Sequence, residues 1–252
     1  MSVITLSGLR GKRALVTGAA DGLGKAIADA LHANGAIVFG TSRSAETTAA
    51  ICERYNSPTI PGLDVADAAS IPTFADEVER VSGGIDLLVN NAGINIPKPA
   101  TELTDEDWSQ VFDTNVKGTF IVSREFGRRW LADTRAGSIV NVASQAGVVA
   151  IEERAAYGTS KAAMIHLTKQ LALEWAPRGI RVNAVAPTFV KTALTASTLE
   201  RGQWADELRS RIPLGRFGEA EEVAGPVAFL LSDLASLITG HTLVIDAGYT
   251  IR

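Results

Sequence analysis

Short apolar runs alternate with longer segments of helical periodicity along most of this chain. Residues 13–17 (Arg-Ala-Leu-Val-Thr) form an apolar run that stops at glycines, and residues 25–34 then show helical periodicity that ends at Gly35. This is the pattern of a strand, a tight turn and a helix. The same alternation predicts strands at residues 36–40, 59–64, 85–90, 138–142, 180–185 and 242–246, and helices at residues 45–55, 70–82, 105–132, 155–176, 199–210 and 219–232.

The seven predicted strands are rich in Val, Ile and Leu, and helices separate them. Such strands are typical of a parallel sheet that is covered by helices on both faces. We therefore predict a doubly wound α/β fold with a seven-stranded parallel sheet, in a single domain over residues 1–252. No repeat, low-complexity stretch or linker indicates a second domain. The irregular stretch at about 187–217 is longer than ordinary connections, which predicts a substrate lid.

The composition narrows the classes of function. The 252 residues carry a formal net charge of -4 and no block of Lys or Arg, which argues against a nucleic-acid partner. We expect a soluble, cytoplasmic protein without membrane association, because no signal-peptide core or run of eighteen apolar residues is present. The single cysteine, Cys52, cannot form an internal disulfide, and no pattern of metal ligands occurs, so no metal site is expected.

The first candidates for catalysis are Tyr157 and Lys161, which are four residues apart in a predicted helix. Ser144 lies thirteen residues before Tyr157. At this spacing the phenol and the ammonium leave the same face of the helix. A fixed cation would lower the pKa of Tyr157 from its ordinary value near about 10, making it a usable general acid or base. By itself, the spacing also fits any amphipathic helix.

Glycines follow the first predicted strand, in the order Thr17-Gly18-Ala19-Ala20-Asp21-Gly22-Leu23-Gly24. Glycines at this place let the backbone approach a pyrophosphate, which the free amides at the start of a helix then hold. The spacing Gly-x-x-x-Gly-x-Gly differs from the commoner Gly-x-Gly-x-x-Gly fingerprint. A glycine turn without a ligand is the alternative.

Taken together, the motifs of this chain resemble those of the short-chain dehydrogenase/reductase family over essentially its whole length. The matching residues follow the family's order and spacing: the turn from Thr17 to Gly24, Asp64-Val65, Asn90-Asn91-Ala92-Gly93, Asn115, Ser144, Tyr157, Lys161 and Pro187. The resemblance implies a Rossmann fold that binds NAD(P) through Gly18, Asp21, Gly22, Leu23, Gly24, Ser42, Arg43, Asp64, Val65, Asn91, Ala92, Gly93, Tyr157, Lys161, Pro187, Val190 and Thr192. Taken alone, Asp64 also fits a solvated acid and Asn91 a satisfied turn residue.

The choice between NAD and NADP depends on the end of the second strand. The family's acidic position, which would accept bonds from the ribose 2′-OH, falls on Ser42, and Arg43 follows it. This favours NADP, although Asp21 would place a negative charge near a 2′-phosphate. Arg43 also fits an ordinary exposed arginine.

The resemblance further implies a catalytic set of Asn115, Ser144, Tyr157 and Lys161. Tyr157 would act as general acid in reduction and general base in oxidation, and Ser144 would donate to the substrate oxygen. Lys161 would also bind the nicotinamide ribose, and Asn115 would hold a water that links Lys161 to solvent. A hydrolase nucleophile at Ser144 is not indicated, because its neighbours do not form a Gly-x-Ser-x-Gly elbow.

The expected substrate residues lie after the fourth, fifth and sixth predicted strands: Asn95, Ser144, Gln145, Glu152, Tyr157 and Thr188. Their polar groups suit a polyol, sugar or sugar acid, and the same residues also fit solvated loop positions. Two positions depart from the family's pattern, since Thr188 follows Pro187 where glycine is usual, and Ala247 replaces the first of two glycines before Tyr249.

We therefore predict an NAD(P)-dependent oxidoreductase that interconverts a secondary alcohol and a ketone, acting on a small molecule. The alternatives are a 3-oxoacyl thioester reductase of the same fold and a cofactor-sensing binding protein without turnover. Members of the family are commonly tetramers built from the last helix and strand, here about 219–251. The resemblance thus implies a homotetramer.

Overall fold

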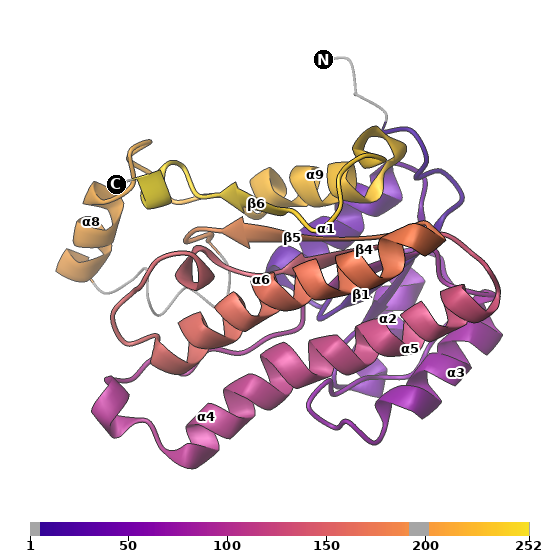
Figure 1. Ribbon diagram of the computed structural model, residues 1–252, viewed down its shortest axis with the longest axis horizontal. Coiled ribbons are helices and arrows are strands. Elements are labelled where there is room, and N and C mark those ends of the chain that lie inside the picture. The colour runs from indigo at the N-terminus through magenta and orange to yellow at the C-terminus, as the bar shows by residue number, and fades with distance from the viewer. Residues whose placement is uncertain (1–5, 192–201, 252) are drawn as a thin grey trace.

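A computed structural model describes residues 6–191 and 202–251. Its strands form one parallel sheet in the order β2-β1-β3-β4-β5-β6 (Figure 1). The strands are β1 (Arg13–Thr17), β2 (Ile37–Thr41), β3 (Leu87–Asn90), β4 (Gly137–Val142), β5 (Ile180–Pro187) and β6 (Thr242–Ile245). The helices are α1 (Gly22–Ala33), α2 (Ala45–Arg54), α3 (Ile71–Ser82), α4 (Asp105–Phe112), α5 (Thr119–Ala132), α6 (Ala155–Trp175), α8 (Gly202–Ser210) and α9 (Ala220–Leu231).

Helices cover both faces of the sheet. Helices α1 and α9 pack together on one face, with α2 beside α1 at the β2 edge, where the Tyr55 hydroxyl bonds to Asp29 at 2.9 Å. Helices α3, α5 and α6 cover the other face, and α5 and α6 run side by side across it (Figure 1). The two apolar cores between these layers confirm the prediction of a doubly wound fold in a single domain.

The strand order reverses at β1. The chain passes from β1 to β2 in one direction and then returns to place β3 on the other side of β1. In parallel α/β sheets, ligands bind beyond the carboxyl ends of the strands at such a reversal. The fold therefore brings the residues after β1, β2, β3, β4 and β5 to one edge.

The predicted strand at residues 59–64 is wrong, and the described sheet has six strands instead of seven. The segment still follows the end of β2, because Leu63 N donates to Ser42 O at 2.7 Å and Thr41 Oγ1 donates to Pro61 O at 3.2 Å. Pro61 has no N–H to add to a strand ladder, and so regular pairing does not develop.

The predicted helix at residues 105–132 is interrupted. A π-helical segment, η2 (Asp113–Gly118), separates α4 from α5 and contains Asn115. Gly118 at its end packs against the carbonyl group of Val65, where any side chain would overlap that carbonyl. Short π-helical segments of this kind occur frequently at functional sites.

The described part of the predicted lid forms a small apolar cluster of its own. Its buried residues are Phe189, Ala205, Leu208, Ile212 and Phe217, and partly buried Ile151, Ala247 and Tyr249 pack against them. The start of the predicted helix at 199–210 and Thr192 lie outside the described residues. Among the helices that are described, none is long and apolar enough to cross a membrane.

Candidate active site

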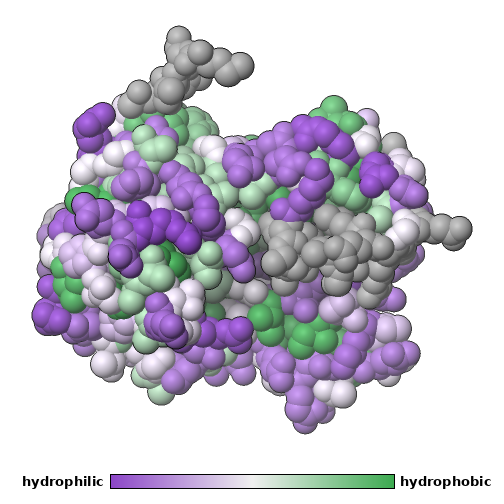
Figure 2. All heavy atoms as spheres, turned by 180° about the vertical axis from the view of Figure 1, so that it is seen from behind, coloured by the Kyte–Doolittle hydropathy of each residue, from purple (hydrophilic) through white to green (hydrophobic). Residues whose placement is uncertain are grey.

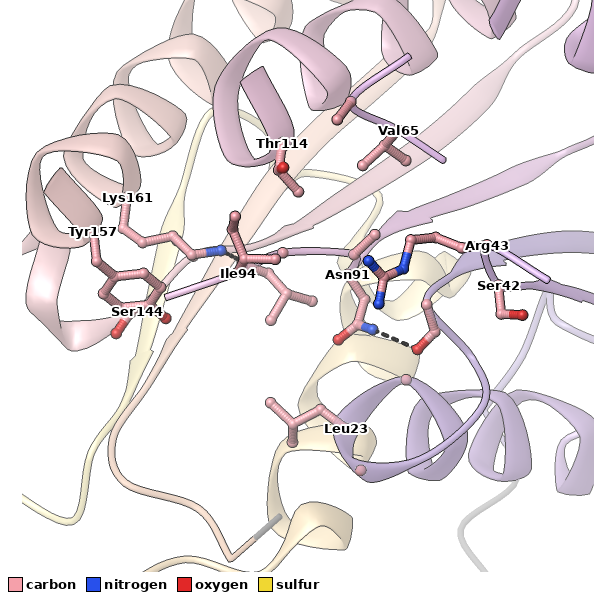
Figure 3. Close-up of a pocket in the computed structure, with 18 of the residues that line it drawn as sticks. Leu23, Ser42, Arg43, Val65, Asn91, Ile94, Thr114, Ser144, Tyr157 and Lys161 are labelled. Atoms are coloured by element: carbon pink, nitrogen blue, oxygen red, sulfur yellow. Dashed lines mark hydrogen bonds between the residues drawn. The ribbon is translucent and has the colours of Figure 1, made fainter. Parts of the chain in front are cut away.

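A cavity of about 820 Å³ lies at the carboxyl edge of the sheet. The space-filling view from behind in Figure 2 shows a hollow near the middle of the molecule, and Figure 3 shows residues that line the cavity. Of the predicted site residues, those on its wall are Gly18, Asp21, Gly22, Leu23, Gly24, Ser42, Arg43, Asp64, Val65, Asn91, Ala92, Gly93, Ser144, Tyr157, Lys161, Pro187, Thr188 and Val190. One cavity thus joins the predicted cofactor turn to the predicted catalytic pair.

The glycine turn is built for close approach. Gly18 and Gly22 have φ values of 65° and 51°, in the left-handed region that favours glycine. A side chain on Gly24 would overlap the carbonyl oxygen of Gly18. At the start of α1, Asp21 makes no side-chain capping bond, so the first amides of the helix face the cavity without a side-chain partner. Such amides are suited to a phosphate group.

Asn91 holds this turn in place. Its Nδ2 donates to Gly18 O at 3.0 Å (Figure 3) and to Thr17 O at 3.0 Å, and its main-chain N–H donates to Thr17 Oγ1 at 3.0 Å. Thr17 Oγ1 also accepts from Ala92 N at 3.0 Å. The side chain of Asn91 therefore ties the loop after β3 to the glycine turn.

Ser42 and Arg43 follow β2 and point in different directions. The hydroxyl of Ser42 donates to Ser44 O at 3.1 Å, so it is turned back onto its own loop. The exposed side chain of Arg43 extends along the cavity toward the side of the glycine turn (Figure 3). Asp21 and Asp64 also line this end and are exposed, so positive and negative charges share it.

Ser144, Tyr157 and Lys161 meet at the other end of the cavity. Ser144 follows β4, and its Oγ accepts from Ala146 N at 3.1 Å, which leaves the hydroxyl hydrogen free to be donated. The hydroxyl groups of Ser144 and Tyr157 lie next to each other (Figure 3), within reach of a hydrogen bond. Lys161 is buried, and its Nζ donates to Val142 O at 2.8 Å.

Burial is the main influence on both titratable groups of this pair. It raises the pKa of the Tyr157 phenol above its usual value, while the hydrogen bond with Ser144 and the charge of Arg154 act to lower it. Burial lowers the pKa of Lys161 to about 8. The expectation that the pKa of Tyr157 lies below its ordinary value is therefore wrong for this structure, because loss of solvent outweighs the nearby charges.

Asn115 does not line the cavity. Its Oδ1 accepts from Ile94 N at 2.9 Å, and its Nδ2 donates to Ile94 O at 2.9 Å and to Ser160 Oγ at 3.0 Å. Both amide hydrogens are thus used inside the protein. A water next to Lys161, as expected from the sequence, would have to donate to an acceptor, such as the remaining lone pair of Asn115 Oδ1.

Three of the expected substrate residues, Asn95, Gln145 and Glu152, are not on the described cavity wall. Glu152 is exposed, whereas Gln145 is 1% exposed. Asn95 Oδ1, Gln145 Oε1 and Thr188 Oγ1 are buried without a hydrogen-bond partner. Each of these three residues directly follows a residue that lines the cavity, namely Ile94, Ser144 or Pro187. Within the described residues, no cluster of side chains could hold a metal ion.

Comparison with known proteins agrees with the geometry. A family profile described as "Enoyl-(Acyl carrier protein) reductase" matches residues 18–250. The chain is 43% identical over 248 residues to D-threitol dehydrogenase of Mycolicibacterium smegmatis, covering 97% of this chain and 95% of that protein. This chain belongs to the short-chain dehydrogenase/reductase family.

Other relatives of this short-chain dehydrogenase/reductase differ in their named substrates. It is 41% identical to the NAD-dependent glycerol dehydrogenase of Listeria innocua, with 96% of this chain and 94% of the relative covered. It is also 41% identical to 3-oxoacyl-(acyl-carrier-protein) reductase of Escherichia coli, with 94% and 97% covered. All of these relatives are oxidoreductases by name, and the chain is accordingly an NAD(P)-dependent oxidoreductase of CH-OH groups.

A solved relative shows the same fold. The crystal structure of a gluconate 5-dehydrogenase from Burkholderia cenocepacia in complex with NADP and tartrate superposes with a TM-score of 0.92. It is 32% identical in sequence and covers 96% of both chains. The likeness therefore extends over the cavity as well as the sheet.

Part of the cavity wall was not predicted from the sequence. Ile94 directly follows Gly93, and Thr114 directly precedes Asn115 (Figure 3). The face of α4 and the start of η2 add a polar stretch of wall: Glu106, Ser109, Gln110 and Asp113. Their spacing of three, one and three residues is that of one helix face, which is the signal that could have identified them.

Proposed function

We propose that this enzyme is an NADP(H)-preferring dehydrogenase of a polyol, sugar or sugar acid, which interconverts a secondary alcohol and a ketone. The observation that carries the proposal is a single cavity with two different ends. One end is the uncapped start of α1 beside a glycine turn, which suits a pyrophosphate. The other end holds the adjacent hydroxyl groups of Ser144 and Tyr157 above buried Lys161.

The residues present fit a nicotinamide dinucleotide. Gly24 leaves no room for a side chain because Gly18 O and Asn91 Nδ2 lie against it, and the loop from Asn91 to Gly93 lines the same cavity. The nicotinamide supplies the acceptor of a hydride in oxidation and its donor in reduction. Gly18, Gly22 and Leu23 would hold the pyrophosphate side, Asn91 would lie beside the adenine ribose, and Lys161 would bind a ribose hydroxyl.

The protein itself supplies proton transfer and orientation. In oxidation, the substrate hydroxyl lies against Ser144 Oγ and Tyr157 Oη, and Tyr157 Oη takes its proton as hydride leaves the carbon. In reduction, the same Oη returns the proton to the oxygen. Ser144 donates a hydrogen bond to the substrate oxygen as its charge changes. The positive charge of Lys161 favours the phenolate form of Tyr157 that this cycle requires.

Three buried oxygen atoms support a substrate with several hydroxyl groups. Asn95 Oδ1, Gln145 Oε1 and Thr188 Oγ1 have no partner in the described structure. A buried acceptor without a donor costs about 1–3 kcal/mol. Hydroxyl groups on carbons next to the reacting one would supply such donors after small side-chain adjustments. The names of the relatives that act on threitol, glycerol and gluconate agree with this class.

Arg43 supports the preference for NADP(H). It is a cation on the cavity wall directly after Ser42, and Ser42 is the position where an acidic residue would select NAD. The bound NADP of the gluconate 5-dehydrogenase supports the same choice. The NAD-dependent glycerol dehydrogenase and the negative charge of Asp21 point the other way. A direct comparison of the two cofactors is therefore part of the test.

A 3-oxoacyl thioester reductase is the second candidate. The similarity to the Escherichia coli reductase favours it, and so does a second cavity of about 520 Å³. This second cavity is lined mostly by small apolar residues, among them Ala146, Val148, Val149 and Ile151. A cofactor-sensing protein without turnover would need neither Tyr157 nor Lys161.

One substrate panel separates these candidates. Polyols, sugar acids, simple ketones and a 3-oxoacyl thioester are each tested with NAD(H) and NADP(H), by absorbance of the reduced nicotinamide. We expect the highest kcat/KM with a polyol or sugar acid and NADP(H). Highest kcat/KM with the thioester would replace this proposal by the second candidate. Cofactor binding without turnover on any substrate would indicate the sensor.

The proposal includes a homotetramer in the cytoplasm, assembled through residues 219–251. Leu237 is 97% exposed, Ile251 81% and Leu234 56%, all near the carboxyl end of the chain. A second copy of the chain packed on this stretch would cover these side chains. Light scattering of the purified protein would measure the mass of the assembly.

A further inference from the structure

Ser160 lies between the catalytic candidates Tyr157 and Lys161 on α6, and it is completely buried. Its Oγ donates to Tyr157 O at 2.7 Å, one turn back along the helix. The same oxygen accepts a hydrogen from Asn115 Nδ2 at 3.0 Å. The hydroxyl of Ser160 therefore joins the turn of α6 that carries Tyr157 to the π-helical segment that carries Asn115.

The other hydrogen bonds of Asn115 extend this connection to the cavity. Its amide pairs with both the N–H and the carbonyl group of Ile94, each at 2.9 Å. Ile94 lines the cavity directly after Gly93. An unbroken series of hydrogen bonds thus runs from the loop at the cavity wall, through Asn115 and Ser160, to the main chain of Tyr157.

The packing at Gly93 leaves little freedom in this arrangement. A Cβ atom at Gly93 would lie 3.1 Å from Asn115 Oδ1 and 3.5 Å from Lys161 Nζ. The loop backbone therefore fits between the amide of Asn115 and the ammonium of Lys161. A small rotation of that amide would move the loop against Lys161, or move α6 away from the loop.

We propose that Ser160 is a positioning residue, which fixes the distance between the cavity loop at Gly93–Ile94 and the reactive groups of α6. Removal of its hydroxyl would leave a hydrogen of the Asn115 amide without a partner in a buried place, and that amide would seek another. Tyr157 and Lys161 would then lose their fixed placement against the loop. Because Ser160 acts through other residues, this inference rests on the proposed function of Tyr157.

Ser123 on α5 provides a matched control. It is also completely buried, its Oγ donates to Thr119 O at 2.7 Å, and it accepts from Asn90 Nδ2 at 2.9 Å. It therefore makes the same two kinds of bond as Ser160, to a carbonyl of its own helix and from an asparagine amide. Among the described hydrogen bonds, none joins Ser123 to Asn115. The two serine-to-alanine variants thus lose the same kinds of hydrogen bond, but only Ser160→Ala removes a bond to Asn115.

The experiment compares Ser160→Ala with Ser123→Ala, using the polyol of highest turnover and full pH profiles of kcat and KM. We expect both variants to lose thermal stability to a similar extent. Only Ser160→Ala should lower kcat, on the order of tenfold or more, with KM for the cofactor nearly unchanged. The rise of kcat with pH should also occur at a higher pH in this variant than in the parent enzyme, because the phenolate of Tyr157 would be less well stabilised.

A double-mutant cycle links the effect to Asn115. In an Asn115→Ala background, Ser160→Ala should cause little further loss of kcat. In the parent background, Ser160→Thr, which keeps a hydroxyl, should retain most of the parent kcat. If Ser160→Ala does not fold, Ser160→Cys has nearly the same shape with weaker hydrogen bonds and should show the same direction of change. Equal kcat and equal pH profiles for the Ser160 and Ser123 variants would overturn the proposal.

Tyr157→Phe is measured in the same series. Full turnover in that variant would contradict the proposed function of the site. Loss of turnover in Tyr157→Phe, together with identical behaviour of the two serine variants, would contradict the role of Ser160 alone. The two failures are therefore distinguishable.

Discussion

The ammonium of Lys161 lies over the ring of Tyr157, with Nζ 5.6 Å from the ring centre, and is bonded to the carbonyl of Val142. The phenolic oxygen is hydrogen-bonded to Ser144 instead. A cation over an aromatic face is stabilised by the negative charge of that face. Ser144 thus acts on the oxygen of Tyr157 directly, whereas Lys161 acts on the tyrosine through space.

Replacement of Tyr157 by phenylalanine should abolish nearly all turnover. Loss of a positioned general acid or base lowers rates by about 10²–10⁴-fold. Cofactor affinity, measured by quenching of protein fluorescence, should change little, because the ring remains. Tyr55→Phe is the control, since Tyr55 bonds to Asp29 between α1 and α2 and does not line the cavity. Turnover within a few-fold of the parent enzyme in Tyr157→Phe would disprove the mechanism.

Lys161 should make the stability of the protein depend on pH. Its pKa is about 8 when folded, against 10.5 for an ordinary lysine, so the unfolded chain binds more protons between these values. Its contribution to the free energy of unfolding should therefore rise with pH from about 8 to 10.5, by at most about 3 kcal/mol.

Urea unfolding of the parent protein and Lys161→Met at several pH values measures this contribution. The difference in free energy of unfolding, parent minus variant, should become more favourable to the parent as the pH rises through that window. Lys169→Met serves as the control, because Lys169 is an exposed lysine of the same helix. A difference that stays constant between pH 7 and pH 10.5 would show that burial of Lys161 carries no such penalty.

Arg43 should determine the preference for the 2′-phosphate. Arg43→Ala is expected to raise KM for NADP⁺ by about tenfold to a hundredfold, the range of a charge-assisted hydrogen bond of 1.5–3 kcal/mol. KM for NAD⁺ should change little, and Ser42→Asp should lower it. Arg54→Ala, at the exposed end of α2, should leave both values unchanged. Equal effects of Arg43→Ala on both cofactors would remove the case for NADP(H).

Two helical glycines should respond in opposite ways to alanine. In Gly24→Ala the new methyl group would overlap Gly18 O, so we expect loss of cofactor affinity and of thermal stability. Gly225 in α9 has open space where a Cβ would go, and Gly225→Ala should stabilise the helix by about 0.5–1 kcal/mol. Calorimetric melting with and without cofactor measures both. Undiminished cofactor binding by Gly24→Ala would mean that the turn does not hold the pyrophosphate.

Most of the sheet, and the meeting of Ser144, Tyr157 and Lys161 at one cavity, could be predicted because their signals are local. Apolar runs mark β1 to β6, and the residues after them reach one edge whatever the details of packing. The strand expected at 59–64 does not form, although its sequence has the apolar pattern of a strand, because Pro61 has no N–H to donate to a neighbouring strand. The break at Asp113–Gly118 follows from packing of Gly118 on Val65, a contact that the pattern of a single helix cannot show.

The energetics of the site depend on contacts that are distant in sequence. The spacing of Tyr157 and Lys161 placed them on one helix face, but it did not show that Val142 holds the ammonium or that burial dominates both pKa values. The partners of Asn115 are likewise 21 and 45 residues away. Such contacts exist only after the helices have packed on the sheet.

The π-helical segment at Asp113–Gly118 also limits how the length of this chain can change during evolution. Each residue of an α-helix turns the chain by about 100°. Deletion of one residue here would restore an ordinary helix and rotate α4 by about that angle relative to α5. Glu106 and Gln110 would then face away from the cavity. Substitutions on α4 can alter that wall one side chain at a time, whereas a single deletion would replace the whole wall at once.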